Sequence, residues 1–130
     1  MKTPLPPGWP RPKGYSNGIS ARGRTIVTAG VVGWDEQEKF TSNTLPGQFE
    51  QVLKNIVAIL AEDGAAPEHL VRLTCYVTSI EAYLASLSEI GEAWQRVIGK
   101  HYPAMAMVEV ARLVEPQAMV EIEATAVVEE

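Results

Sequence analysis

Two stretches of the chain carry apolar residues at steps of three and four, the spacing that buries one face of a helix. The first begins near Leu45, after a capping Thr44, and is stopped by Gly64. Its apolar positions are Phe49, Val52, Leu53, Ile56, Ile59 and Leu60. The second is capped by Ser79 and closed by Gly99, and its apolar positions are Ala82, Tyr83, Leu87, Ile90, Trp94, Val97 and Ile98. The pattern predicts two helices, each with one buried face.

Alternating apolar and polar residues predict strands in the remaining segments. In residues 70–77, Val71, Leu73, Cys75 and Val77 alternate with Arg72, Thr74 and Tyr76. Residues 104–110 and 119–128 are interpreted as two more strands, joined by a turn at 113–117. Residues 18–21 and 25–29, on either side of a turn at Gly23, predict a β-hairpin. The order β-β-α-β-α-β-β predicts a two-layer α+β fold, in which one sheet carries both helices on one face.

Composition and the N-terminal segment limit the classes of protein to which the chain can belong. Five prolines within residues 1–13 predict an extended arm, and residues 14–130 are expected to form one domain. With 46% hydrophobic and 21% charged residues, the chain has the balance of a globular protein. The net charge of −5 and the scattered basic residues argue against a nucleic-acid partner. Charges interrupt the apolar stretches before the roughly 20 residues of a membrane helix, so we expect no membrane association and a cytoplasmic location.

Motifs for common chemistry are few. No glycine-rich nucleotide loop and no paired cysteines are present, and His69 and His101 lie far apart in the chain. Neither a metal nor a cofactor is expected. Cys75 falls on the apolar side of its strand, where a small buried hydrophobe is a better interpretation than a nucleophile. Glu121 and Glu123 share one face of the last strand, opposite the apolar residues; such a face is usually only solvated.

A series of short segments resembles, in order and spacing, the landmarks of the RidA (reactive intermediate deaminase, YjgF-like) family. They are Tyr15 to Gly18, Thr28 to Gly30, Gln48 to Leu60, Gly64 to Leu70, Thr74 to Thr78, Tyr102 to Ala104 and Val120 to Ala124. The resemblance runs from Tyr15 to Val128. It implies a fold like that of the small trimeric chorismate mutases, a homotrimer with an inner barrel of sheets, and a small-molecule ligand in each intersubunit cleft.

The resemblance also implies roles for particular residues. Glu121 matches the acidic residue that positions or activates the water attacking an imine carbon. The substrate-binding positions would be Tyr15, Gly30, Leu87, Ala104, Met105 and Met107. Three of these depart from the family pattern, because Met105 replaces an arginine that binds the substrate carboxylate, Leu87 an asparagine and Met107 a cysteine. The pocket is therefore expected to be more apolar than usual, with Arg24, Arg72 or Arg112 as alternative carboxylate anchors.

Three functions are compatible with the sequence. The first is hydrolysis of an imine or enamine with release of ammonia, for a substrate of altered type such as an aminomuconate-like ring-cleavage product. The second is a non-catalytic small-molecule-binding or regulatory trimer of the same fold. The third is the ribonuclease activity ascribed to some relatives, against which the acidic charge argues.

Overall fold

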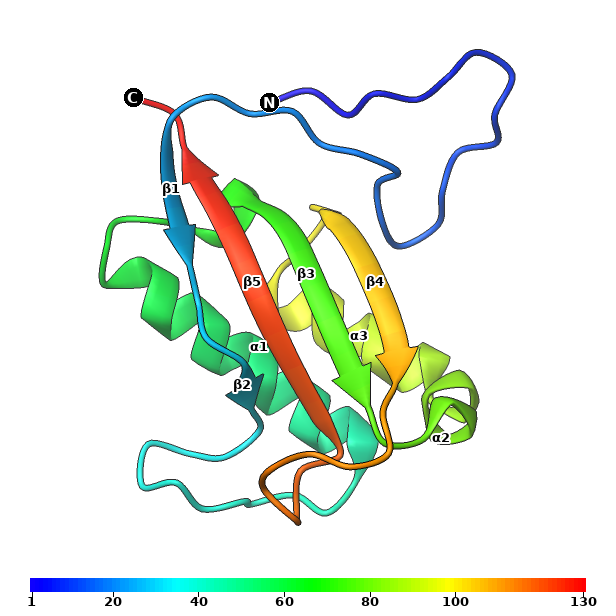
Figure 1. Ribbon diagram of the computed structural model, residues 1–130, viewed down its shortest axis with the longest axis vertical. Helices are drawn as coiled ribbons and strands as arrows, with labels where there is room; N and C mark the ends of the chain where they lie inside the picture. The colour runs from blue at the N-terminus through cyan, green and yellow to red at the C-terminus, as the bar shows by residue number, and fades with distance from the viewer.

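The computed structural model describes residues 1–130 and contains one mixed sheet, covered by helices on one face and open on the other (Figure 1). The strand order is β1-β5-β3-β4, and the short β2 also pairs with β5. The strands are β1 (Arg24–Val27), β2 (Val31–Val32), β3 (Leu70–Val77), β4 (Ala104–Glu109) and β5 (Val120–Val128). The helices are α1 (Leu45–Ala61), α2 (Ile80–Ala85) and α3 (Leu87–Val97), with a 3-10 turn at Pro67–His69. The predicted two-layer α+β fold is confirmed.

The core lies between the sheet and the helical layer, as the periodicities predict. Phe49, Leu53 and Ile56 of α1 pack against Leu73 of β3 and Ile122 of β5, and all five side chains are buried. Two positions differ from the prediction. Ile59 is 45% exposed at the margin of α1. A register shift between Leu70 and Arg72 turns Leu70, instead of Val71, into the core.

The predicted hairpin of residues 18–21 with 25–29 is wrong. β1 pairs with β5 instead, and Ser20 forms only an isolated bridge with Lys2 of the arm. Gly23 explains the path, because a Cβ there would lie 2.1 Å from the carbonyl oxygen of Val128. Its φ of 147° lets the backbone cross the end of β5 and enter the sheet beside that strand. Pairing with a central strand buries more of Ile26 than a two-stranded hairpin would.

The last two strands are present but are not neighbours, because β3 separates β4 from β5 (Figure 1). β4 runs parallel to β3, to which the helical crossover returns it, and β5 runs antiparallel to β3. The predicted second helix is also broken in two. Ser86, with φ −115° and ψ 14°, separates α2 from α3, and serine favours such positions over helix interiors. Leu87 therefore starts a new helix and is 50% exposed, outside the buried face.

A buried amide joins the loops at one end of the sheet. The side-chain nitrogen of Gln48 donates to the carbonyl oxygens of Ser42 (3.1 Å) and Gln117 (2.9 Å). Its side-chain oxygen accepts from the backbone nitrogen of Met119 at 2.8 Å. Gln48 is only 1% exposed, so its side-chain amide cannot bond to water instead. The amide therefore fixes the entry to α1 against the entry to β5.

Gln48→Leu should lower the free energy of unfolding by about 2 to 4 kcal/mol, because it removes three hydrogen bonds to part-buried backbone groups. Gln51→Leu is the matched control, since Gln51 bonds only to Asn55 on the same helix and should cost below about 1 kcal/mol. Urea unfolding at one fixed protein concentration measures both. Equal effects of the two substitutions would contradict this role of Gln48.

Candidate functional site

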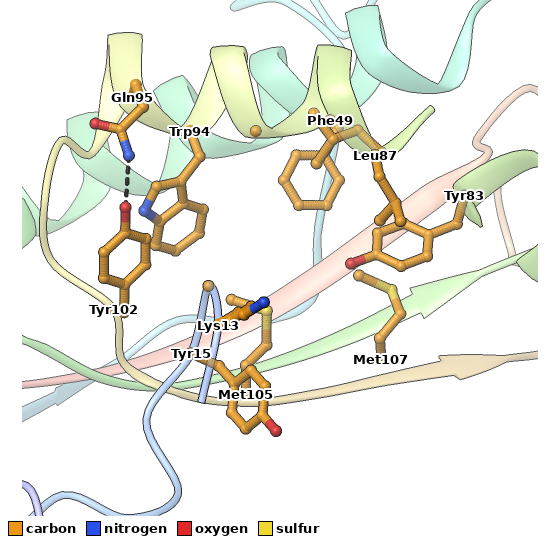
Figure 2. A pocket seen from close by; sticks show the side chains of 13 residues that line it. Lys13, Tyr15, Phe49, Tyr83, Leu87, Trp94, Gln95, Tyr102, Met105 and Met107 are labelled. Carbon is orange, nitrogen blue, oxygen red and sulfur yellow. Dashed lines mark hydrogen bonds between the residues drawn. The ribbon is translucent and has the colours of Figure 1, made fainter. Parts of the chain in front are cut away.

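A cavity of about 500 Å³ lies between α3 and the edge strand β4 (Figure 2). Met105 and Met107 extend from β4 toward the helices, and Trp94 of α3 lies across the cavity from them. The full lining is Lys13, Gly14, Tyr15, Phe49, Tyr83, Leu87, Ile90, Gly91, Trp94, Gln95, Tyr102, Met105 and Met107. Most of these side chains are apolar, and concave apolar sites with a few polar groups are typical of small-molecule binding.

The end of the arm and the residues that follow it close one side of this cavity, because Ser16 bonds to the backbone just before β4. The backbone nitrogen of Ser16 donates to the carbonyl oxygen of Pro103 at 3.1 Å, and its hydroxyl donates to that of Tyr102 at 2.5 Å. These bonds hold the preceding residues, Tyr15 and Lys13, against the cavity. Figure 2 shows Tyr15 beside Met105, and 43% of Tyr15 stays exposed.

One wall of the cavity is built from fixed aromatic rings. The rings of Trp94 and Tyr102 stack with centroids 6.3 Å apart and an interplanar angle of 10°. Gln95 donates its side-chain N–H to the Tyr102 hydroxyl at 2.6 Å (Figure 2). The indole N–H of Trp94 donates to the carbonyl oxygen of His101 at 3.1 Å. These bonds fix both rings in orientation, so the wall offers a preformed flat surface.

Polar groups inside the cavity are few. Burial raises the pKa of Tyr83, so its phenol is a neutral hydrogen-bond donor at neutral pH. The hydroxyl of Tyr83 and the ammonium of Lys13 point toward the same part of the cavity in Figure 2. Lys13 is the one charged residue of the lining. The cavity can therefore accept an apolar molecule that carries an acceptor or an anionic group.

Glu121 lies on the opposite, open face of the sheet, where it pairs with Val32 of β2 and Tyr76 of β3. Its carboxylate touches Gly30, because a Cβ on that glycine would lie 2.5 Å from the Oε2 of Glu121. Glu121 is half-buried and has no hydrogen-bond or ion-pair partner within the chain, whereas Glu123 accepts a hydrogen bond from the Tyr76 hydroxyl at 2.8 Å. The two glutamates thus differ: the carboxylate of Glu121 is free to act on another molecule.

The backbone beside Glu121 is held in place from α1. The side-chain nitrogen of Asn55 donates to the carbonyl oxygens of Val32 (3.0 Å) and Trp34 (2.8 Å). These bonds fix the chain where it leaves β2. Asn55 thus holds the segment that follows β2, next to the place where the Glu121 carboxylate lies against Gly30 on the open face.

Comparison with known proteins identifies the family of this chain. The family model described as Endoribonuclease L-PSP matches residues 10–128. The chain belongs to the Rid (YjgF/YER057c/UK114) family. A RutC family protein of Pyrococcus abyssi is 32% identical over 119 residues, which cover 90% of this chain and 89% of that protein. The chloroplastic Reactive Intermediate Deaminase A of Arabidopsis thaliana is 34% identical over 113 residues, covering 86% of this chain and 57% of that protein. The crystal structure of a Yersinia pestis protein of unknown function from the Rid family matches with a TM-score of 0.77 at 32% identity, covering 88% of this chain and 87% of that one.

The structure divides the site residues predicted for this Rid protein into two groups. Around the cavity lie Tyr15, Leu87, Met105 and Met107. Gly30 and Glu121 lie together on the open face of the sheet. Ala104 also lies on the open face, on β4 beside Ser16. The strand register explains the division: Met105 pairs with buried Leu73, whereas Glu121 pairs with Tyr76, which faces away from the helices. One subunit therefore does not bring the two groups together.

None of the three arginines considered as carboxylate anchors lines the cavity. Arg24 forms ion pairs with Asp63 and, at 2.8 Å, with Glu130. Arg72 lies on the open face of β3, and Arg112 borders a separate hollow in the β4–β5 connection. Sequence reasoning missed Lys13, which lies in the proline-rich arm where no periodicity assigns a direction to a side chain; only its closeness to Tyr15 along the chain could have indicated it.

Two further features were searched for in the structure, a metal site and a membrane-spanning helix. No group of three or more His, Cys, Asp or Glu side chains is placed to hold a metal ion. No helix has the length and apolar content needed to cross a membrane.

Cys75 is fully buried, and burial raises the pKa of its thiol to about 12. At pH 8 the native protein should therefore react with a thiol reagent about 1,000-fold more slowly than the unfolded chain, since the thiolate is the reactive form. Absorbance of the released thiolate dye, followed with and without denaturant, measures the two rates. Similar rates would show that Cys75 is accessible and that this part of the core opens readily.

Proposed function

We propose that this Rid protein is a hydrolase that deaminates a small imine or enamine in a site formed between two subunits of a homotrimer. The observation that carries the proposal is the half-buried Glu121 carboxylate, which lies against the Gly30 backbone and has no partner in its own chain. A carboxylate in this state is a suitable general base for a bound water molecule.

The reaction balances without a redox partner. Water adds to the carbon of the C=N bond while Glu121 accepts one of its protons, and Glu121 then passes that proton to the nitrogen, which gives a carbinolamine. The C–N bond of the carbinolamine breaks as its hydroxyl proton is transferred through Glu121 to the nitrogen, so that ammonia leaves and a carbonyl compound remains. An enamine enters the same route after protonation on carbon. The protein's contribution is to hold the water molecule and the C=N carbon in the geometry needed for attack. Such positioning by itself accelerates a reaction.

An intersubunit site would reunite the two groups of residues. The open face of the sheet has no covering element in Figure 1. Its margins carry the apolar Val27 and Val108, which are 69% and 42% exposed. Closed assembly of three such sheets would cover this face and would set the β4 edge of one subunit against the β2 edge of the next. The cavity with Met105 would then face Glu121 of the partner subunit.

The departures from the family pattern bear on the substrate. A thioether at Met105 cannot hold a carboxylate as a guanidinium fork does, and Met107 and Leu87 extend the apolar lining. Small 2-imino acids should consequently be poor substrates. A larger molecule with an apolar body, which depends less on a guanidinium anchor for its carboxylate, fits the proposal better.

The proposal is tested by ammonia release from imines that an L-amino-acid oxidase generates in the assay from alanine, leucine and phenylalanine. We expect faster release than in the absence of the protein, with preference for the larger imines. Light scattering should give three times the 14.2 kDa subunit mass. A stable monomer at micromolar concentration would remove the intersubunit site, and with it the proposed mechanism.

A non-catalytic binding or regulatory trimer of the same fold is the second candidate. The lack of arginine in the apolar lining favours it, because such a cavity can bind a ligand without activating it. Tight binding of an apolar ligand, with no acceleration for any imine, would replace the deaminase proposal by this one.

A further inference from the structure

We propose that the cavity selects a monoanionic ligand with an aromatic or similarly large apolar body, and that Lys13 of the arm binds its anionic group. That such a ligand is also converted rests on the proposed function, whereas its binding does not. It makes the arm, residues 1–13, part of the binding site.

The charge distribution supports an anion at this place. Within one subunit, Lys13 is the one charged side chain of the lining, and no carboxylate of the same chain borders the cavity. Lys13 also takes part in none of the ion pairs of the chain. Eight of the eleven Lys and Arg residues form no ion pair, so Lys13 is distinguished by its position beside an apolar cavity. Lys13 is exposed at the cavity mouth, and an anionic ligand seated in the cavity would supply its counterion there, where the apolar lining excludes part of the water.

The geometry of the arm directs Lys13 to the cavity. Gly14 has a φ of 79°, a left-handed conformation that turns the chain between Lys13 and Tyr15. The bonds from Ser16 to the start of β4 then hold this turn in place. Figure 2 shows the resulting arrangement, in which the Lys13 ammonium lies between the β4 side chains and α3. The turn is thus a built feature of the cavity mouth.

The size and surface of the cavity define the rest of the ligand. About 500 Å³ is far more than a three-carbon acid fills. The stacked Trp94 and Tyr102 rings, with Phe49 and Met105, provide flat apolar surfaces for a ring or a branched chain. With a single cation present, one negative charge is matched and a second would stay unpaired. An ammonium is also less demanding in geometry than a guanidinium, so ligands of different lengths can reach it.

The test measures binding by calorimetry with the full-length protein and three variants. The probes are 3-phenylpropanoate, its neutral amide 3-phenylpropanamide, and propanoate. We expect 3-phenylpropanoate to bind the wild type and propanoate to bind far more weakly. Lys13→Gln should weaken 3-phenylpropanoate about tenfold while leaving the amide unchanged, since only the anion uses the ammonium.

Arg11→Gln is the matched control, because it removes the same charge from the same arm beside a different hollow. It should leave the affinity for 3-phenylpropanoate unchanged. Equal weakening by Arg11→Gln and Lys13→Gln would reduce the effect to general charge and overturn the inference. Equal weakening of acid and amide by Lys13→Gln would also overturn it, as would no binding of either phenyl compound.

The third variant, Glu121→Gln, separates this inference from the proposed function. It should bind 3-phenylpropanoate at least as tightly as the wild type. Binding through Lys13 without turnover of any imine would sink the deaminase proposal and leave the ligand class standing. Turnover of imines that is insensitive to Lys13→Gln would overturn the role of Lys13 and leave the deaminase proposal standing.

Discussion

Glu121→Gln should lower kcat for ammonia release by a factor of about 100 to 10,000, the usual contribution of a general base. Glutamine keeps the shape of the side chain beside Gly30 and can still bond a water molecule, but it cannot accept the proton. The rate is followed by coupling ammonia to a dehydrogenase, with the imine generated in the assay. KM should change little, because Glu121 touches the water and not the body of the substrate.

Glu123→Gln is the control for this experiment, and its activity should stay within about twofold of the wild type. The two residues share a strand and a face, but the carboxylate of Glu123 is bonded to the Tyr76 hydroxyl. If both substitutions reduce the rate alike, the effect comes from the charge or stability of the open face. Full activity of Glu121→Gln would leave the reaction without its base.

Met105→Arg should raise kcat/KM for 2-iminopropanoate by a factor of about 30 to 1,000, corresponding to about 2 to 4 kcal/mol for a buried charged pair. Met105 is half-buried, faces the cavity and lies beside Tyr15, so an arginine there could bind a small carboxylate with both arms of its fork. The same change should reduce activity on the phenylalanine-derived imine, because it occupies part of the apolar cavity.

Met105→Leu provides the comparison, since it keeps the cavity apolar and should gain nothing with 2-iminopropanoate. Initial rates over a range of imine concentrations separate kcat from KM. If Met105→Arg folds and assembles as the wild type does but gains no activity on the small imine, the cavity is not the place where the substrate carboxylate lies.

Local periodicity predicted the elements of this fold well, and pairing over long distances was where it failed. The face of α1 that holds Phe49 and Ile56, and the alternation along β3 and β5, follow from residues a few positions apart. The pairing of Ile26 with Ala126 does not, because nothing near either residue identifies its partner. The break at Ser86 was also missed, since the apolar spacing continues across it.

The site was predicted in parts. The resemblance named Tyr15, Met105 and Met107, and the structure places all three around one cavity. Their roles stay predictions. None of the three candidate arginines lines the cavity of one subunit, and their role as anchors in an intersubunit site stays a prediction. The reach of a long side chain depends on its strand face and on loop paths, which sequence does not fix. Lys13 was missed for the same reason, since its direction depends on the turn at Gly14.

Complementation between subunits tests the central claim, that cavity and base come from different subunits. Glu121→Gln removes the base. Gly91→Trp blocks the cavity, because Gly91 lines it on α3 and a Cβ there meets no atom within 4 Å. Each variant alone should be inactive. Mixed trimers refolded from equal amounts should regain about a quarter of the wild-type activity, since a quarter of the clefts join an intact cavity to an intact base. No recovered activity, in trimers shown by native mass spectrometry to be mixed, would contradict the intersubunit site.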